Sequence, residues 1–251
     1  MPKDGHDFDG LGDAHLALWE SKISRADKHQ IRSECFISRF IKIRFDEEKL
    51  GAVVRLYEAM FRVDFRLPFL FVVQELLNYL NLAPHQLIPN AWRVFYSCMV
   101  LWPLALGKQH QLTVREFLYL HRVHKNPGGP GVFNVQTRHG KLIQLKPKYS
   151  SNRGWKNHFF FTSGQWEFAP TEKAQGPRVS HETNALSEKG HQAPRLTPSE
   201  IARVNDVLDW AQRHDSQMLY DVMCTVSRLM EFVYVLAAHV IGVKYCILDP
   251  P

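Results

Sequence analysis

The chain has 251 residues, of which 45% are hydrophobic and 22% are charged, and this composition excludes a wholly disordered protein. The formal net charge of +6 permits acidic partners such as nucleic acid or an anionic surface, but it establishes neither. The four cysteines are far apart and form no CxxC pair, so a disulfide-built secreted domain is disfavoured. We therefore expect an intracellular protein, and the sequence does not distinguish the nucleus from the cytoplasm.

The N-terminal part is expected to contain a flexible tail over residues 1–13, followed by one domain over residues 14–168. The tail is acidic and glycine-rich and lacks the basic and apolar regions of a secretory signal. Acidic residues at positions 46–48 would suit the positive end of a helix dipole. A helix is predicted after them because apolar side chains recur at helical spacing, namely Leu50, Val53, Val54 and Tyr57.

Three further helices are predicted in the middle of the chain. The first covers residues 68–81, because proline is tolerated in the first helical turn and an apolar stripe follows it. The second starts at residue 90 and is apolar on nearly every face, which indicates a buried helix that Pro103 should kink or end. The third covers residues 113–123 and begins with a Thr-x-x-Glu capping box that ends on Glu116.

Strands are predicted after the Pro- and Gly-rich loop at residues 126–131. The apolar period changes there, and two strands are expected around His139 and Gly140, with a second hairpin turning at Ser163 and Gly164. The predicted fold is therefore α+β, a mainly helical bundle with a small antiparallel sheet at about residues 133–168.

The C-terminal part is expected to consist of a disordered linker over residues 169–197 and helices over residues 198–248. The linker is polar and nearly free of large apolar side chains. The apolar run at residues 232–243 is shorter than the roughly 20 residues that a membrane-spanning helix needs. It is therefore interpreted as a buried helix, and no membrane partner is expected.

Sequence motifs of catalysis are missing from the chain. The common nucleotide-binding, zinc-protease and serine-hydrolase signatures do not occur, so we expect no enzyme, no catalytic residue, no cofactor and no small-molecule substrate. His121 and His124 lie three residues apart on the predicted helix and could face one side. They lack cysteine or carboxylate partners at metal-ligand spacing, so structural histidines are favoured over a metal site.

The charge distribution gives the main functional hint. No Asp or Glu occurs between Glu116 and Glu167, and this interval carries eight cations. Lys and Arg side chains neutralise phosphates and release counterions, so the interval favours a nucleic-acid surface. The candidate nucleic-acid-binding residues are Arg138, Lys141, Lys146, Lys148, Arg153 and Lys156.

Aromatic residues are interleaved with these cations. They are Phe133, Tyr149, Trp155, Phe159, Phe160, Phe161 and Trp166. Two interpretations stay open: exposed rings could stack on unpaired bases, or the rings could pack a sheet against the helices and leave the cations solvated.

Several motifs in the same half of the chain occur in a characteristic order. The first is Arg66, Leu67 and Pro68, and the second is the connection LAPHQLIPNAWR at residues 82–93. The helix LTVREFLY at residues 112–119 follows, and the segment closes on WKNHFFFTSGQWEF at residues 155–168. In this order the motifs resemble the plant gypsy-type transposon domain, over about residues 65–168.

The resemblance implies a retrotransposon-derived protein without catalytic activity and without assigned binding residues. The first expectation is a Gag-like assembly or nucleic-acid-associated module of a gypsy-type element, with RNA or DNA and further copies of the chain as partners. The alternative is a protein–protein interaction module that does not bind nucleic acid.

Overall fold

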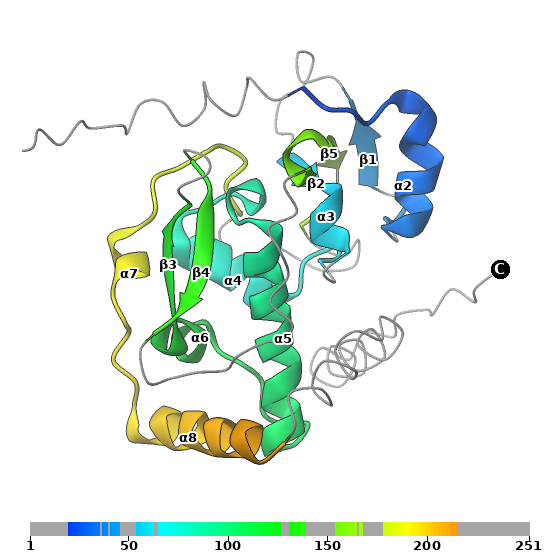
Figure 1. Cartoon of the computed structure of the whole chain (residues 1–251). Helices are drawn as coiled ribbons and strands as arrows, with labels where there is room; N and C mark the ends of the chain where they lie inside the picture. Colours follow the sequence, from blue (N-terminus) through cyan, green and yellow to red (C-terminus); the bar gives the residue numbers. More distant parts are fainter. Residues whose placement is uncertain are drawn as a thin grey trace, which may run out of the picture.

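A computed structural model of the protein describes residues 20–35, 37–39, 41–45, 54–62, 65–126, 131–138, 154–164, 166–167 and 178–214. These residues form a mixed α+β fold of helices and two small antiparallel sheets, which confirms the predicted class (Figure 1). The predictions for the tail at residues 1–13 and for the helix after residue 214 lie outside the described residues.

The helices and strands follow one another in this order: η1 (Arg25–Asp27), α2 (Lys28–Glu34), β1 (Ile41–Arg44), β2 (Val54–Tyr57), α3 (Glu58–Phe61), α4 (Phe71–Leu80), η2 (Pro84–Gln86), α5 (Pro89–Leu106), α6 (Val114–Leu120), β3 (His121–Lys125), β4 (Phe133–Thr137), η3 (Trp155–Asn157), β5 (Phe159–Gly164), α7 (Glu188–His191) and α8 (Pro198–Arg213).

The three-stranded sheet has the order β1-β5-β2, and both neighbours run antiparallel to β5. The predicted hairpin turning at Ser163 and Gly164 is therefore wrong, because β5 pairs with N-terminal strands instead of with the residues that follow it. The predicted helix after residue 48 is also wrong in its described part. Val54–Tyr57 is strand β2 and is buried at every position. The sequence of such a strand does not alternate between apolar and polar residues, so its period could not be recognised.

The two-stranded sheet pairs β3 with β4, from His121 opposite Thr137 to Lys125 opposite Phe133. The predicted helix over residues 113–123 ends earlier, at Leu120. The backbone N–H of Arg138 donates to the Leu120 carbonyl over 2.8 Å, so the end of β4 satisfies a carbonyl that a longer helix would have used. The predicted turn at His139 and Gly140 lies outside the described residues.

The remaining helices agree with the sequence signals in part: α4 begins at Phe71, so the predicted start at Pro68 is wrong, and Pro103 does not end α5. Helix α4 ends at Leu80, and Asn81 caps it in the left-handed conformation with φ 58°. Helix α5 continues past Pro103 and ends at Leu106. The predicted capping box of α6 is confirmed, since the Glu116 carboxylate accepts from the Thr113 N–H over 3.0 Å and the Thr113 hydroxyl accepts from the Glu116 N–H over 3.2 Å.

The hydrophobic core runs continuously from the three-stranded sheet to the helices. Phe61 stacks on Phe160 of β5 with ring centroids 5.8 Å apart, and Phe65 meets Trp92 of α5 edge-on at 4.9 Å. Phe95 of α5 then contacts Phe117 of α6 at 4.9 Å. Helix α5 is thus the central helix that its apolar sequence predicts. None of the helices within the described ranges is long and apolar enough to cross a membrane.

Residues 178–197 run along the outside of the helical domain, and we call them the strap (Figure 1). The expectation of a disordered linker is corrected for this part. Ser187 donates its N–H to the Leu80 carbonyl over 2.9 Å and its hydroxyl to the Tyr79 carbonyl over 2.7 Å. Polar contacts with α4 and η2 hold the strap. These partners lie about 100 positions away in sequence, so the composition of the strap does not predict that it is ordered.

Candidate nucleic-acid interface

The β3–β4 hairpin has one buried face and one open face. His121, Val123 and Phe133 are at most 3% exposed and form the buried face. Helix α7 packs beside β3, and the Ile88 N–H donates to the Phe133 carbonyl over 3.0 Å beside β4. Both edges of the hairpin are therefore flanked, and its second face lies on the outer side of the molecule (Figure 1).

Four polar side chains occupy the second face because side chains alternate along each strand. Arg122 lies opposite Gln136, and His124 lies opposite Asn134. Arg122 and Gln136 are exposed, and the other two residues are half-buried. We call Arg122, His124, Asn134 and Gln136 the hairpin polar face. All four belong to the interval without Asp or Glu, so the face carries no carboxylate of its own.

The amide oxygens of this face accept hydrogen bonds from within the hairpin. The Gln136 Oε1 accepts from Arg122 Nε over 3.2 Å and from Arg122 Nη2 over 2.7 Å. The Asn134 Oδ1 accepts from the Val135 N–H over 2.8 Å. The guanidinium and the two amide nitrogens offer N–H donors to a ligand beside the positive charge of Arg122, and Asn134 Oδ1 keeps a second lone pair.

His124 adds little charge to the face near neutral pH. Its partial burial, and secondarily the positive charge of Arg122, lower the pKa of the imidazole below its ordinary value. The neutral form is therefore favoured, and its Nδ1 is buried without a hydrogen-bond partner. The cation of the hairpin polar face is Arg122, a residue that belongs to the acid-free interval but not to the predicted candidates.

Among the predicted binding residues, Arg138 has a structural position. Its Nε donates to the carbonyls of Leu118 and His121, each over 3.1 Å, so the guanidinium closes the end of α6. Burial lowers the pKa of Arg138 from its ordinary value, and its Nη2 is buried without a partner. Because Arg138 Nε is used by two backbone carbonyls, it is not available to bind a phosphate.

The other predicted binding residues are not brought together by the described structure. Lys156 is half-exposed in η3, just before β5 of the three-stranded sheet, whereas Arg138 follows β4 of the other sheet. The remaining candidates, Lys141, Lys146, Lys148 and Arg153, lie outside the described residues. Whether the six cations converge on one face therefore stays a prediction.

Most described aromatic side chains of this interval pack inside the protein. Six of those interleaved with the cations are 0–7% exposed, namely Phe133, Trp155, Phe159, Phe160, Phe161 and Trp166. Phe117 of α6 is also buried, whereas Tyr119 is half-buried. Trp155 meets Tyr57 edge-on at 4.6 Å, and Trp166 meets Phe69 in the same way at 5.4 Å. For these six rings the packing interpretation is confirmed. Tyr149 lies outside the described residues.

His121 and His124 lie on opposite faces of β3, so the expectation that they could share one side of a helix is wrong. His121 is fully buried, its ring stacks on Phe117 at 4.7 Å, and its Nδ1 lies 3.1 Å from the Phe117 carbonyl. Burial is the main cause that lowers its pKa to about 4. In the part of the chain that the structure describes, no three His, Cys, Asp or Glu residues gather as a metal site would require.

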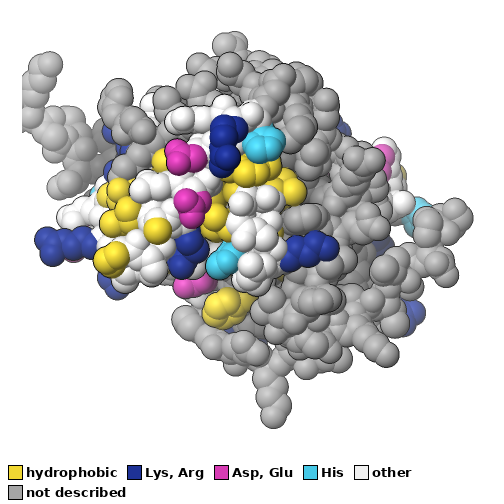
Figure 2. All heavy atoms as spheres, turned by 90° about the horizontal axis from the view of Figure 1, so that it is seen from below, with side chains coloured by type: hydrophobic (Ala, Val, Ile, Leu, Met, Phe, Trp, Pro, Cys, Tyr) yellow, Lys and Arg dark blue, Asp and Glu magenta, His cyan; other side chains and the backbone are white. Residues whose placement is uncertain are grey.

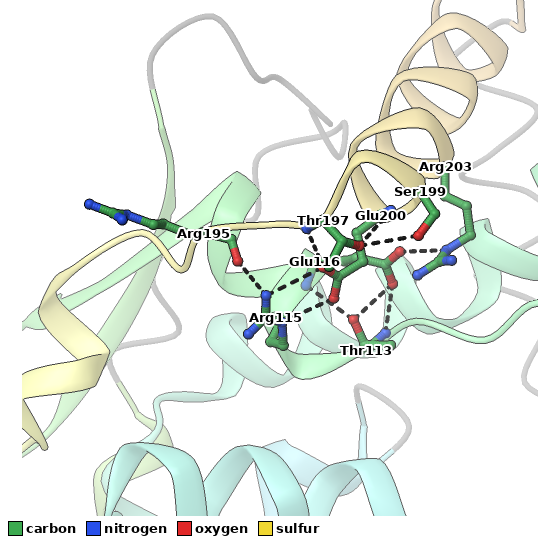
Figure 3. A network of polar contacts seen from close by, with 8 residues as sticks. All are labelled: Thr113, Arg115, Glu116, Arg195, Thr197, Ser199, Glu200 and Arg203. Atoms are coloured by element: carbon green, nitrogen blue, oxygen red, sulfur yellow. Dashed lines mark hydrogen bonds and ion pairs between the residues drawn. The ribbon is translucent and has the colours of Figure 1, made fainter.

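A second polar cluster, which motif reasoning missed, attaches α8 to α6 (Figure 3). Helix α8 begins with its own capping box, in which the Glu200 carboxylate accepts from the Thr197 N–H over 2.6 Å. Arg115 of α6 donates to Glu200 over 3.0 Å, and Arg203 of α8 donates to Glu116 over 2.7 Å. The two capping boxes are thus tied by two arginines, and we call these contacts the α8 clamp.

The α8 clamp has a different electrostatic character from the hairpin polar face. The hydrogen bond from Arg115, and then that from the Thr197 N–H, lower the pKa of Glu200 to about 2. Seen from below, the surface over α8 mixes acidic, basic and apolar side chains (Figure 2). A surface of mixed sign attracts polyanions weakly, so the hairpin polar face is the better candidate.

No family model, no curated protein and no solved structure matches this chain.

Proposed function

We propose that this protein is a non-enzymatic, retrotransposon-derived module of Gag-like type that associates with nucleic acid inside the cell. The observation that carries the proposal is the hairpin polar face, where a cation and amide donors lie together and none of the four residues is a carboxylate. The order of sequence motifs from residue 65 to residue 168 supports the retroelement origin.

The chemistry of this face favours phosphate as the ligand group. Phosphate oxygens only accept hydrogen bonds, and the face offers donors and a positive charge. Six described aromatic rings of the same interval, those from Phe133 to Trp166, are buried and cannot stack on bases, and Tyr119 is half-buried. The side chains therefore support binding through the sugar–phosphate backbone. Both RNA and DNA have such a backbone.

A salt series tests the proposal. The affinity of the full chain for labelled RNA and DNA would be measured by fluorescence anisotropy between about 50 and 200 mM salt. The expected result is a linear fall of the logarithm of the association constant with the logarithm of the salt concentration. The reason is that Lys and Arg side chains that bind phosphates displace counterions from the nucleic acid. A chain without salt-dependent affinity for either nucleic acid would disprove nucleic-acid association.

The alternative is a protein–protein interaction module without nucleic-acid binding. Phe71, the first residue of α4, is 55% exposed and could anchor a protein partner. Light scattering addresses the assembly role, because a Gag-like module should self-associate as its concentration rises. A monomer at high concentration would contradict that role, whereas self-association without nucleic-acid affinity would favour the alternative.

A further inference from the structure

The junction between the strap and α8 combines a threonine–proline pair with the polar contacts that attach α8. We propose that Thr197 is phosphorylated by a protein kinase of the proline-directed class, and that the phosphate opens the α8 clamp at its pair of Arg115 and Glu200. This modification does not depend on nucleic-acid association, because it concerns only the attachment of α8.

Thr197 has a residue beside it that selects the class of kinase. Pro198 follows it, and this is the only Ser-Pro or Thr-Pro pair among the 251 residues. Proline has no N–H, so a kinase that selects the next residue by its backbone donor rejects this site, whereas a kinase with a pocket for the proline ring accepts it. The sequence therefore offers this class of enzyme one hydroxyl group.

The Thr197 hydroxyl lies on an accessible stretch of chain. Residues 197–199 are exposed, as are residues 192, 193 and 195 of the strap, and Thr197 itself is extended, with φ −70° and ψ 161°. Its Oγ1 accepts from the Glu200 N–H over 3.3 Å, which is longer than an ordinary hydrogen bond. Its other contact, over 3.1 Å, is with the hydroxyl of the exposed Ser199. The hydroxyl can therefore leave the helix cap at small cost.

The reaction uses ATP as the phosphoryl donor. The Thr197 oxygen bonds to the γ-phosphorus, the bond from that phosphorus to the bridging oxygen breaks, and ADP leaves with the electron pair. The hydroxyl proton goes to a carboxylate of the kinase. The product carries a charge of about −1.5 to −2 at neutral pH and three strong acceptor oxygens.

Arg115 is the cation that lies closest to both sides of this site. It donates to the Arg195 carbonyl, two residues before Thr197, and to the Glu200 carboxylate, three residues after it (Figure 3). The side chain of Arg195 points away from the cluster (Figure 3). The phosphate therefore competes with Glu200 for one guanidinium, and the two anions repel each other across the capping box. The pair of Glu116 and Arg203 is separate from this competition.

Incubation of the full chain with a purified proline-directed kinase and ATP tests the site. Tandem mass spectrometry should find a phosphoryl group on Thr197. Ser199→Ala removes the neighbouring exposed hydroxyl and should be modified like the wild type. Pro198→Ala keeps the Thr197 hydroxyl without the ring that the kinase selects, so it should stay unmodified. A wild-type chain without phosphate on Thr197, or a Pro198→Ala variant modified as fast as the wild type, would overturn the assignment.

Hydrogen exchange of the phosphorylated and the unmodified chain tests the effect on the α8 clamp. Residues 200–204, in the first turns of α8, should exchange about fivefold faster after phosphorylation, the ratio expected for the loss of one N-cap. Helix α6 should keep its protection, because Glu116 still accepts from Thr113 and Arg203. Unchanged exchange of α8 in a chain that carries the phosphate would overturn the opening of the clamp.

Arg115→Gln tests the competition for the guanidinium. In this variant Glu200 has already lost its cation, so residues 200–204 should exchange faster before any modification. Phosphorylation should then accelerate their exchange by less than in the wild type. An equal acceleration in both chains would contradict the competition for Arg115.

Discussion

The fully buried carboxylate of Glu116 accepts a hydrogen bond from Arg203 Nε over 2.7 Å, although the two residues lie 87 positions apart. The other oxygen of this carboxylate accepts from the N–H and the hydroxyl of Thr113, over 3.0 and 2.9 Å. One side chain therefore closes the N-terminus of α6 and anchors α8 (Figure 3).

Replacing Arg203 by alanine should destabilise the protein through this pair. The change leaves a buried carboxylate without its cation, and because Arg203 is 29% exposed we expect a loss of about 2 kcal/mol in the free energy of unfolding, below the cost for a fully buried pair. Urea denaturation measures it. Arg213→Ala, at an exposed position of the same helix, is the control and should cost little. Equal stability of both variants would show that the clamp does not hold α8.

Gln86 should be essential for the position of the strap. Its side chain is fully buried; Nε2 donates to the Gly131 and Asn184 carbonyls, and Oε1 accepts from the N–H groups of Ala83 and Asn184. Gln86→Leu leaves these buried backbone groups without hydrogen-bond partners. We therefore expect a loss of about 3 kcal/mol in the free energy of unfolding. Hydrogen exchange of residues 178–197 should accelerate. Gln192→Leu, an exposed change on the strap, is the control, and slow exchange in the Gln86 variant would contradict the prediction.

Stability should fall with acid because two histidines are buried in their neutral form. Burial first, then the charge of Arg55, lowers the pKa of His85 to about 3, and burial lowers that of His121 to about 4. The ordinary value of 6.5 applies in the unfolded chain, so below it the unfolded state binds more protons. The stabilisation is complete above pH 6.5 and is lost as the pH falls toward 4 and then 3.

The pH effect can be measured by urea denaturation between neutrality and acid. Each histidine should contribute a slope of about 1.4 kcal/mol per pH unit within its window. His121→Phe should remove one of the two contributions above pH 4 while keeping a flat ring against Phe117. An unchanged slope in this variant would show that His121 is not the titrating group.

Arg138 should behave as a structural residue when it is compared with Arg122. Arg138→Gln removes the donor of the Leu118 and His121 carbonyls, so we expect a loss of about 2 kcal/mol in the free energy of unfolding. The salt dependence of nucleic-acid affinity should stay that of the wild type. A stable Arg138→Gln variant with a weaker salt dependence would instead place Arg138 in the interface, as its charge alone predicts.

The fold could be predicted from sequence where the signal is local. The capping box of Thr113 and Glu116 and the end of α4 before Asn81 depend on residues within one helical turn. The strand pairs could not be predicted in the same way. Thr162 lies opposite Val54, which is 108 positions away, and strands buried on both faces lose the alternation that reveals a strand.

The candidate interface was predictable in part. The acid-free interval points to the region of the hairpin polar face, yet charge alone cannot tell Arg122, which faces outward, from Arg138, which caps a helix. That difference depends on β3 being a strand, since alternation sends Arg122 and His121 to opposite faces. The α8 clamp was not predicted because each half is an ordinary capping box in the sequence. The ion pairs between them depend on the packing of α8 beside α6, which the sequence does not reveal.

Strand β5 has a consequence for how the chain is made. Its partners β1 and β2 are synthesised more than 100 residues earlier, so they leave the ribosome with no strand to pair with until Gly164 has emerged. Such late, non-local pairing slows folding and leaves apolar edges exposed to other chains. A fragment cut at residues 65–168 would carry β5 with both edges open and the Phe159 to Phe161 run uncovered. Residues 65–168 alone therefore lack the two strands that complete the three-stranded sheet.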